Sequence, residues 1–146
     1  MRSPDLTESH RKSDVRSAAL PVLAAMLLLA SASAQGQTRP SQLEMVQLPK
    51  YCWGQYVKEF AGQPGYSIQN CGGGMNHFCS GLVYMMRANK PGIQRPQKID
   101  NLVHARKEIV YTMDRVTPGC PILGDIQLAD QRLRIMETSV GIKASR

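Results

Sequence analysis

The sequence lacks several patterns that identify common classes of protein. No stretch of useful length alternates apolar and polar residues, as half-buried β-strands do. No apolar run reaches the roughly 20 residues that a membrane-spanning helix needs. Lys and Arg are scattered and form no stripe interleaved with aromatic residues, which disfavours a nucleic-acid-binding protein. We therefore expect an all-α domain without a nucleic-acid partner.

Familiar catalytic and metal-binding motifs are missing as well. There is no Gly-x-Ser-x-Gly, no His-Glu-x-x-His and no P-loop. The four cysteines are separated by 18, 7 and 40 residues. These gaps contain no Cys-x-x-Cys for redox catalysis or haem attachment, and they do not supply the paired ligands of a zinc site. We expect no catalytic residues, no cofactor and a protein that is not an enzyme.

The N-terminus has the features of a secretory leader. Four basic side chains precede an apolar run of about 13 residues from Ala18 to Ala30, which is short for a permanent anchor. Ala32-Ser33-Ala34 then matches the small-residue pattern at which signal peptidase cleaves. We expect a signal peptide over residues 1–34, cleavage near Ala34 and a periplasmic or secreted protein with no membrane span. An uncleaved anchor is the alternative, because the polar region before the apolar run is long and partly acidic.

The chain after the leader is basic and long enough for one small domain. The leader holds 4 of the 18 basic and 3 of the 11 acidic side chains, which leaves 14 against 8 and a net charge near +6. A solvated surface accounts for such an excess. Contact with an anionic surface is the alternative.

Turn residues and apolar spacing divide this chain into three parts. Residues 35–48 are polar, contain Pro40 and are followed by Pro49, so we expect a flexible lead-in there. Residues 49–138 should form a single helical domain, and residues 139–146 a frayed tail. Gly81 falls inside a helix, which costs about 1 kcal/mol unless close packing requires it. Apolar residues at helical spacing predict four helices, over 51–60, 75–89, 96–116 and 121–136.

The four cysteines, Cys52, Cys71, Cys79 and Cys120, all follow the leader. An even number in a short exported chain is typical of disulfides, so we expect two. If the first two helices were antiparallel, Cys52 would lie about 15 Å from the others, beyond the roughly 7 Å that a disulfide spans. A crossover loop that makes these helices parallel is therefore preferred. Within it, Cys52–Cys71 with Cys79–Cys120 is slightly favoured, and the other two pairings stay open.

Between Cys71 and Cys79 lies a candidate contact loop, formed by Gly72, Gly73, Gly74, Met75, Asn76 and His77. Its glycines most simply allow a tight turn between a disulfide and a helix, although their N–H groups could also hold an anion. Met75 and His77 offer ligands that suit Cu(I), which makes a soft-metal site an alternative. Methionines on a helical stripe more often fill a core, so we expect no metal.

Three phrases resemble a family of small, exported, poorly characterised bacterial proteins. They are Tyr51-Cys52-Trp53-Gly54-Gln55-Tyr56, the segment Cys71 to Cys79 (CGGGMNHFC), and Gly119-Cys120-Pro121-Ile122. The resemblance covers roughly residues 49–136 and implies no established activity.

The helix order also resembles tetratricopeptide repeats. Ala105, Ile109 and Pro118 fall near the small, bulky and proline positions of one such repeat, whereas a stable array needs about three. Helix-pair folds of this kind expose grooves that hold peptides or helices. We therefore expect a periplasmic binding or scaffold module for another envelope protein. The alternative is a small-ligand or copper-binding protein that uses the loop of residues 72–77.

Overall fold

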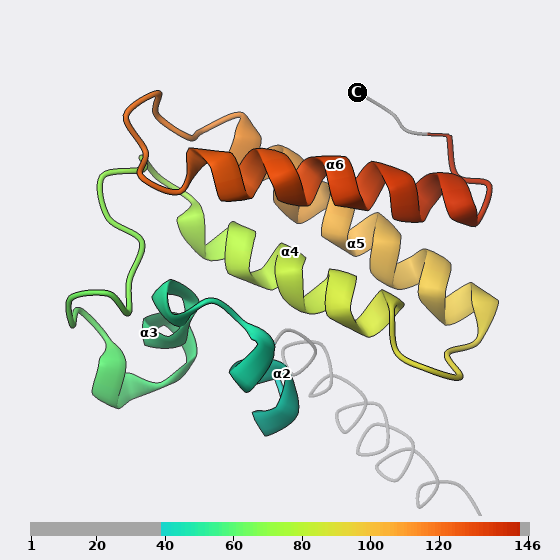
Figure 1. The fold of residues 1–146 in the computed structure, drawn as a ribbon, viewed down its shortest axis with the longest axis horizontal. Helices are drawn as coiled ribbons and strands as arrows, with labels where there is room; N and C mark the ends of the chain where they lie inside the picture. The colour runs from blue at the N-terminus through green and yellow to red at the C-terminus, as the bar shows by residue number, and fades with distance from the viewer. Residues whose placement is uncertain (1–38, 144–146) are drawn as a thin grey trace, which may run out of the picture. The chain divides into compact units, whose positions relative to one another are not determined.

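Three long helices make up most of the structure. The computed structural model describes residues 39–143, which contain helices, turns and irregular segments but no strand. Helices α4 (Met75–Ala88), α5 (Arg95–Met113) and α6 (Leu123–Ser139) run back and forth through short connections (Figure 1). α5 packs along both of the others, whereas α4 and α6 touch only slightly. The predicted all-α fold is confirmed, and a tetratricopeptide-like arrangement is not.

Several predictions concern other parts of the chain. The signal peptide, the first four residues of the lead-in and the last three of the tail lie outside the described residues. Within residues 39–143, no helix combines the length and the apolar composition that crossing a bilayer requires.

An N-terminal segment of short helices packs against α4. It consists of α2 (Gln42–Gln47), the 3-10 turn η2 (Lys50–Cys52), α3 (Trp53–Tyr56) and the 3-10 turn η3 (Lys58–Phe60). The single helix predicted over 51–60 is therefore wrong. Val57 takes an extended conformation that separates α3 from η3. The aromatic rings predicted to form one stripe instead gather locally, with Phe60 stacked on Tyr66 at 4.4 Å and Trp53 packed against both.

Helix α2 lies in the segment predicted to be a flexible lead-in, and it corrects that prediction for residues 41–48. Ser41 and Glu44 form a capping box, in which the Ser41 side chain accepts from the Glu44 N–H and the Glu44 carboxylate accepts from the Ser41 N–H. This Ser-x-x-Glu pattern is visible in the sequence and marks a helix start. Leu48, just after α2, is buried against α4.

The buried carboxylate of Glu44 fastens α2 to the end of α4. It pairs with Arg87 Nε at 3.1 Å and with Lys90 Nζ at 2.9 Å. Burial by itself would raise the pKa of Glu44, but the hydrogen bonds from Arg87, Lys90 and the Ser41 N–H outweigh it and lower the pKa to about 2. Ionised Glu44 is therefore more stable in the folded protein than in the unfolded chain.

Acid should remove this contribution. Because the folded pKa is depressed, the stabilisation is complete above about pH 4.5 and is lost as the pH falls toward 2. It amounts to about 2–3 kcal/mol, since Lys90 is half exposed and partly screened. Urea unfolding of wild type and Glu44→Gln across this pH range is the measurement. The two should differ at pH 7 and converge near pH 2; a constant gap would contradict the assignment.

Two apolar clusters use different sides of α4. One side, with Phe78 and Met85, joins the core of the three long helices. The other, with Cys79 and Val83, packs against the N-terminal segment. The stripe predicted on this helix is thus two adjoining stripes, each facing a different partner. The main core is completed by Leu102, Ala105, Ile109, Ile126, Ala129 and Leu133.

At Gly81, α4 packs closely against α5. A Cβ on Gly81 would lie 2.8 Å from Ile109 Cδ1 and 3.3 Å from Glu108 Cβ. A glycine inside a helix was expected to have a packing reason, and this close contact with α5 is that reason.

The ends of α6 differ from the prediction. The helix begins at Leu123 rather than in the turn that contains Pro121. At the other end, Val140 and Ile142 pack against the core, and Arg95 donates a hydrogen bond to the Val140 carbonyl at 3.1 Å. The described part of the predicted frayed tail is therefore held by contacts.

A buried ion-pair network joins α5 to α6. Arg106 binds Glu137 through two parallel hydrogen bonds, Nε to Oε1 at 3.0 Å and Nη2 to Oε2 at 2.5 Å, and its Nη1 pairs with Asp130. Asp130 also accepts from Arg134 at 2.9 Å. Burial would raise the pKa of Asp130, but the two arginines outweigh it and lower the pKa. Two cations and two anions thus compensate one another, and all of them except half-exposed Arg134 are largely closed to water.

Candidate functional site

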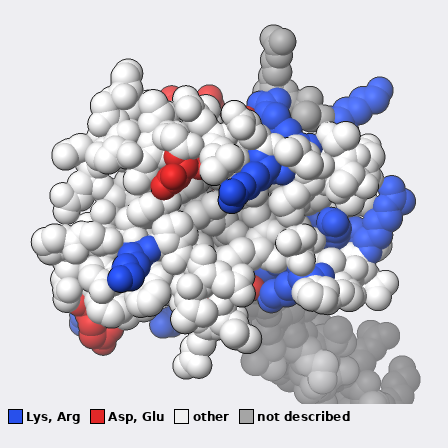
Figure 2. Space-filling model, in the orientation of Figure 1, with Lys and Arg blue, Asp and Glu red and all other residues white. Residues whose placement is uncertain are grey.

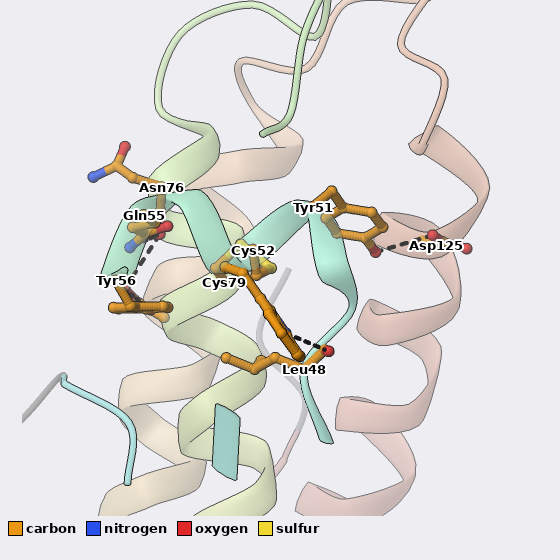
Figure 3. The surroundings of a disulfide bond; sticks show 10 residues. Leu48, Tyr51, Cys52, Gln55, Tyr56, Asn76, Cys79 and Asp125 are labelled. Carbon is orange, nitrogen blue, oxygen red and sulfur yellow. Dashed lines mark hydrogen bonds between the residues drawn. A yellow bond between two sulfur atoms is a disulfide. The ribbon is translucent and has the colours of Figure 1, made fainter. Parts of the chain in front are cut away.

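The two disulfides join Cys52 to Cys79 and Cys71 to Cys120, with Cα separations of 5.6 and 4.3 Å. The slightly favoured pairing, Cys52–Cys71 with Cys79–Cys120, is wrong. Cys79 lies one turn inside α4 on the side that faces η2, where Cys52 is buried beside Leu48 (Figure 3). The first bond therefore fastens the N-terminal segment to α4.

The second bond fastens the start of α4 to the connection between α5 and α6. Cys71 lies beside that connection because the Thr117 N–H donates to the Cys71 carbonyl at 3.1 Å and Thr117 Oγ1 donates to the Asn70 carbonyl at 3.1 Å. Cys120 then follows within the same connection, in reach of Cys71. The two predicted disulfides are therefore present, but with a different partner for each half-cystine.

The candidate contact loop is held closely against the end of α5. Gly72 has a φ of 87°, and a Cβ there would lie 2.5 Å from the Arg115 carbonyl oxygen. Only a glycine fits both the left-handed backbone and the close approach. Gly72, Gly73 and Asn76 remain exposed. The loop is thus an exposed element whose position is set by the disulfide and by α5.

Beside this loop, three side chains pack against one another in series. The rings of His77 and Tyr111 have centroids 4.0 Å apart, and the guanidinium of Arg115 lies 3.6 Å from the centroid of the Tyr111 ring. The Glu108 carboxylate accepts a hydrogen bond from His77 Nδ1–H across 2.6 Å. Tyr111 and Arg115 are exposed. We call the exposed loop together with His77, Tyr111 and Arg115 the stacked surface.

No sequence motif identifies Glu108, Tyr111 or Arg115. Their spacing of i, i+3 and i+7 within the helix predicted over 96–116 does place them on one face. This face can be recognised as part of a site only in the folded protein, where α4 places His77 against Tyr111 and Glu108. The sequence therefore located the loop and His77 but missed Tyr111 on α5 and Arg115 just after it.

The other predicted ligand, Met75, does not join His77. Met75 is buried in the main core, and residues two apart on a helix point in different directions. Within residues 39–143, no group of three or more His, Cys, Asp or Glu side chains is arranged to hold a metal ion. The structure thus assigns Met75 to packing and His77 to the pair with Glu108.

Several pockets flank the N-terminal segment, and two of them adjoin Tyr51. A cavity of about 270 Å³ lies beside the Cys52–Cys79 bond, and its lining includes Gln55, Ile68 and Asn76. A second, of about 230 Å³, is a groove between α4 and α6. Tyr51 lines both pockets and donates a hydrogen bond to Asp125 at 3.0 Å, so that it bridges from η2 to the start of α6 (Figure 3). Burial and this hydrogen bond raise the pKa of Tyr51.

The candidate site therefore consists of the stacked surface and the modest pockets that Tyr51 lines. Comparisons with models of protein families, with curated proteins and with solved structures find no match to this chain.

Proposed function

We propose that this chain is a non-enzymatic binding module for another protein of the bacterial envelope, and that the stacked surface makes the contact. The observation that carries the proposal is the series formed by exposed Arg115, exposed Tyr111 and half-buried His77. Tyr and Arg are enriched among residues that dominate the energy of protein interfaces.

Rigidity supports the proposal. A side chain that is ordered before binding loses less entropy when the partner arrives. Glu108 orients His77, Arg115 covers Tyr111, and the Cys71–Cys120 bond holds the loop beneath them. The surface therefore needs little rearrangement to form an interface.

The compartment and the net charge of this chain restrict the kinds of partner that it could bind. Two disulfides fit an extracellular or periplasmic protein, in which oxidising conditions preserve them. A periplasmic location after signal-peptide cleavage is part of the proposal. The chain after residue 34 has 14 basic and 8 acidic side chains, which favours a partner with an acidic surface.

Crosslinked pull-down from the envelope tests the proposal. Tyr111→Ala and Arg115→Glu should each lower recovery of the partner at least about tenfold, as expected for central interface residues. Lys107→Glu is the matched control, because Lys107 is also exposed on α5 but lies outside the stacked surface. It should leave recovery unchanged.

Far-UV circular dichroism should show that all three variants are folded. Recovery of the same partner at wild-type level by both test variants would overturn the proposal. An equal loss with Lys107→Glu would instead point to nonspecific charge attraction.

A further inference from the structure

The outer face of α6 carries a largely exposed stripe, and within residues 39–143 its one hydrogen bond to another element is the one that Asp125 accepts from Tyr51. Asp125, Leu128, Arg132 and Ile135 recur at spacings of three, four and three residues, which places them on one side of the helix. Leu128 is 44% exposed and Ile135 71% exposed. Neither Asp125 nor Arg132 forms an ion pair within residues 39–143. We call these four residues the α6 stripe.

The groove between α4 and α6 borders this stripe. Asp125, Leu128 and Arg132 form its α6 wall, and Phe78, Leu82 and Met85 form the opposite wall. Because α4 and α6 both pack on α5 but hardly on each other, this side remains open. In the view of Figure 2, most of the face that α4 and α6 share with the N-terminal segment is uncharged, and Lys and Arg lie mainly toward one edge.

The charges of the α6 stripe are arranged so that it complements itself. Along the helix axis, Asp125 lies about 4.5 Å before Leu128 and Arg132 about 6 Å beyond it. A two-fold axis near Leu128 would set two α6 helices antiparallel. Arg132 of each copy would then lie within side-chain reach of Asp125 of the other, with the leucines between them. A two-fold interface is built in this way, from one patch that matches itself.

We propose that the α6 stripe and the adjoining groove form the interface of a homodimer, in which two α6 helices pack antiparallel. Leu128 supplies apolar contact at the groove and Ile135 adds apolar contact further along α6, while two Asp125–Arg132 pairs fix the register. This interface is separate from the stacked surface, so the proposal does not depend on the proposed function.

Reversing the charge of Asp125 or of Arg132 tests whether a second copy of the chain binds this surface and whether the two α6 helices pack in the proposed antiparallel register. In Asp125→Arg, arginines would face arginines across the axis; in Arg132→Asp, aspartates would face aspartates. Each variant should dimerise at least about tenfold more weakly than wild type in sedimentation equilibrium. An equimolar mixture of the two should associate again, because all pairs in the mixed dimer are then of opposite charge. The double variant should also recover.

The controls separate this interface from charge and folding effects. Glu59→Arg and Lys107→Asp change the net charge by the same amounts at exposed positions outside α6, and should leave dimerisation unchanged. The full chain is expressed for export and purified oxidised, with its mass checked for leader removal. Circular dichroism confirms folding.

Three results would overturn the proposal. The first is a wild type that is monomeric up to about 0.5 mM, which would leave the groove to a different occupant. The second is a wild-type dimer that Leu128→Glu does not weaken. The third is a mixture of the two charge variants that stays monomeric although both are folded.

Discussion

Reduction of both disulfides is expected to unfold most of residues 39–143. The bonds span 27 and 49 residues, and loop-closure entropy for such separations corresponds to about 3.5 and 4 kcal/mol. A small domain has a total free energy of unfolding of only about 5–15 kcal/mol. The measurement is urea unfolding, followed by far-UV circular dichroism, of the oxidised protein and of the protein held reduced.

Removing the bonds one at a time should separate their roles. Replacing Cys52 and Cys79 by alanine frees the N-terminal segment, so proteolysis should cut it while the three long helices persist. Replacing Cys71 and Cys120 by alanine detaches the start of α4 from the α5–α6 connection. This change should lower the free energy of unfolding of the three long helices as well. An unchanged urea midpoint after full reduction would contradict this account. Non-reducing peptide mapping that recovers a Cys52–Cys71 peptide would contradict the pairing itself.

Loss of Arg106 should be the most destabilising single substitution in the ion-pair network. Arg106→Met leaves Glu137 buried without its cation and weakens the support of Asp130. Removing one member of a buried pair typically costs about 3–5 kcal/mol, because the remaining charge stays desolvated. The free energy of unfolding in urea at pH 7 is the measurement.

Two further variants make this prediction specific. Arg134→Ala removes a half-exposed partner of Asp130 while Arg106 remains, so it should cost less than about 1 kcal/mol. Arg106→Met with Glu137→Leu removes both ends of the buried pair and should recover much of the stability that Arg106→Met loses. If the double variant is less stable than Arg106→Met, the cost comes from lost packing rather than from an unpaired carboxylate.

Local patterns predicted the long helices well. The apolar stripes over 75–89, 96–116 and 121–136 correspond to α4, α5 and α6 within a few residues at each end. These stripes are long, and each residue's partner lies a fixed distance away along the same helix, so no knowledge of the fold is needed. The close approach at Gly81 was also inferable, since a glycine inside a helix needs a packing reason.

Short elements were harder to predict. The stripe of Trp53 and Phe60 suggested a continuous helix, but their rings pack with Tyr66 from the following loop and the helix breaks at Val57. A helix of ten residues, such as the one predicted over 51–60, is marginally stable by itself, so contacts from outside the segment decide its conformation. For α2, the capping box of Ser41 and Glu44 was a local pattern that two nearby prolines obscured.

The sequence by itself determined the all-α class and the presence of four half-cystines, because helical periodicity and cysteine number are local properties. Only the tertiary structure decided which cysteines pair, since the rotation of α4 turns Cys79 toward Cys52 and the Thr117 contacts bring Cys71 to Cys120. It likewise decided that His77 meets Tyr111 and that Arg106 meets Glu137. Each of these pairs joins residues more than 25 apart, and their distance depends on how whole helices pack.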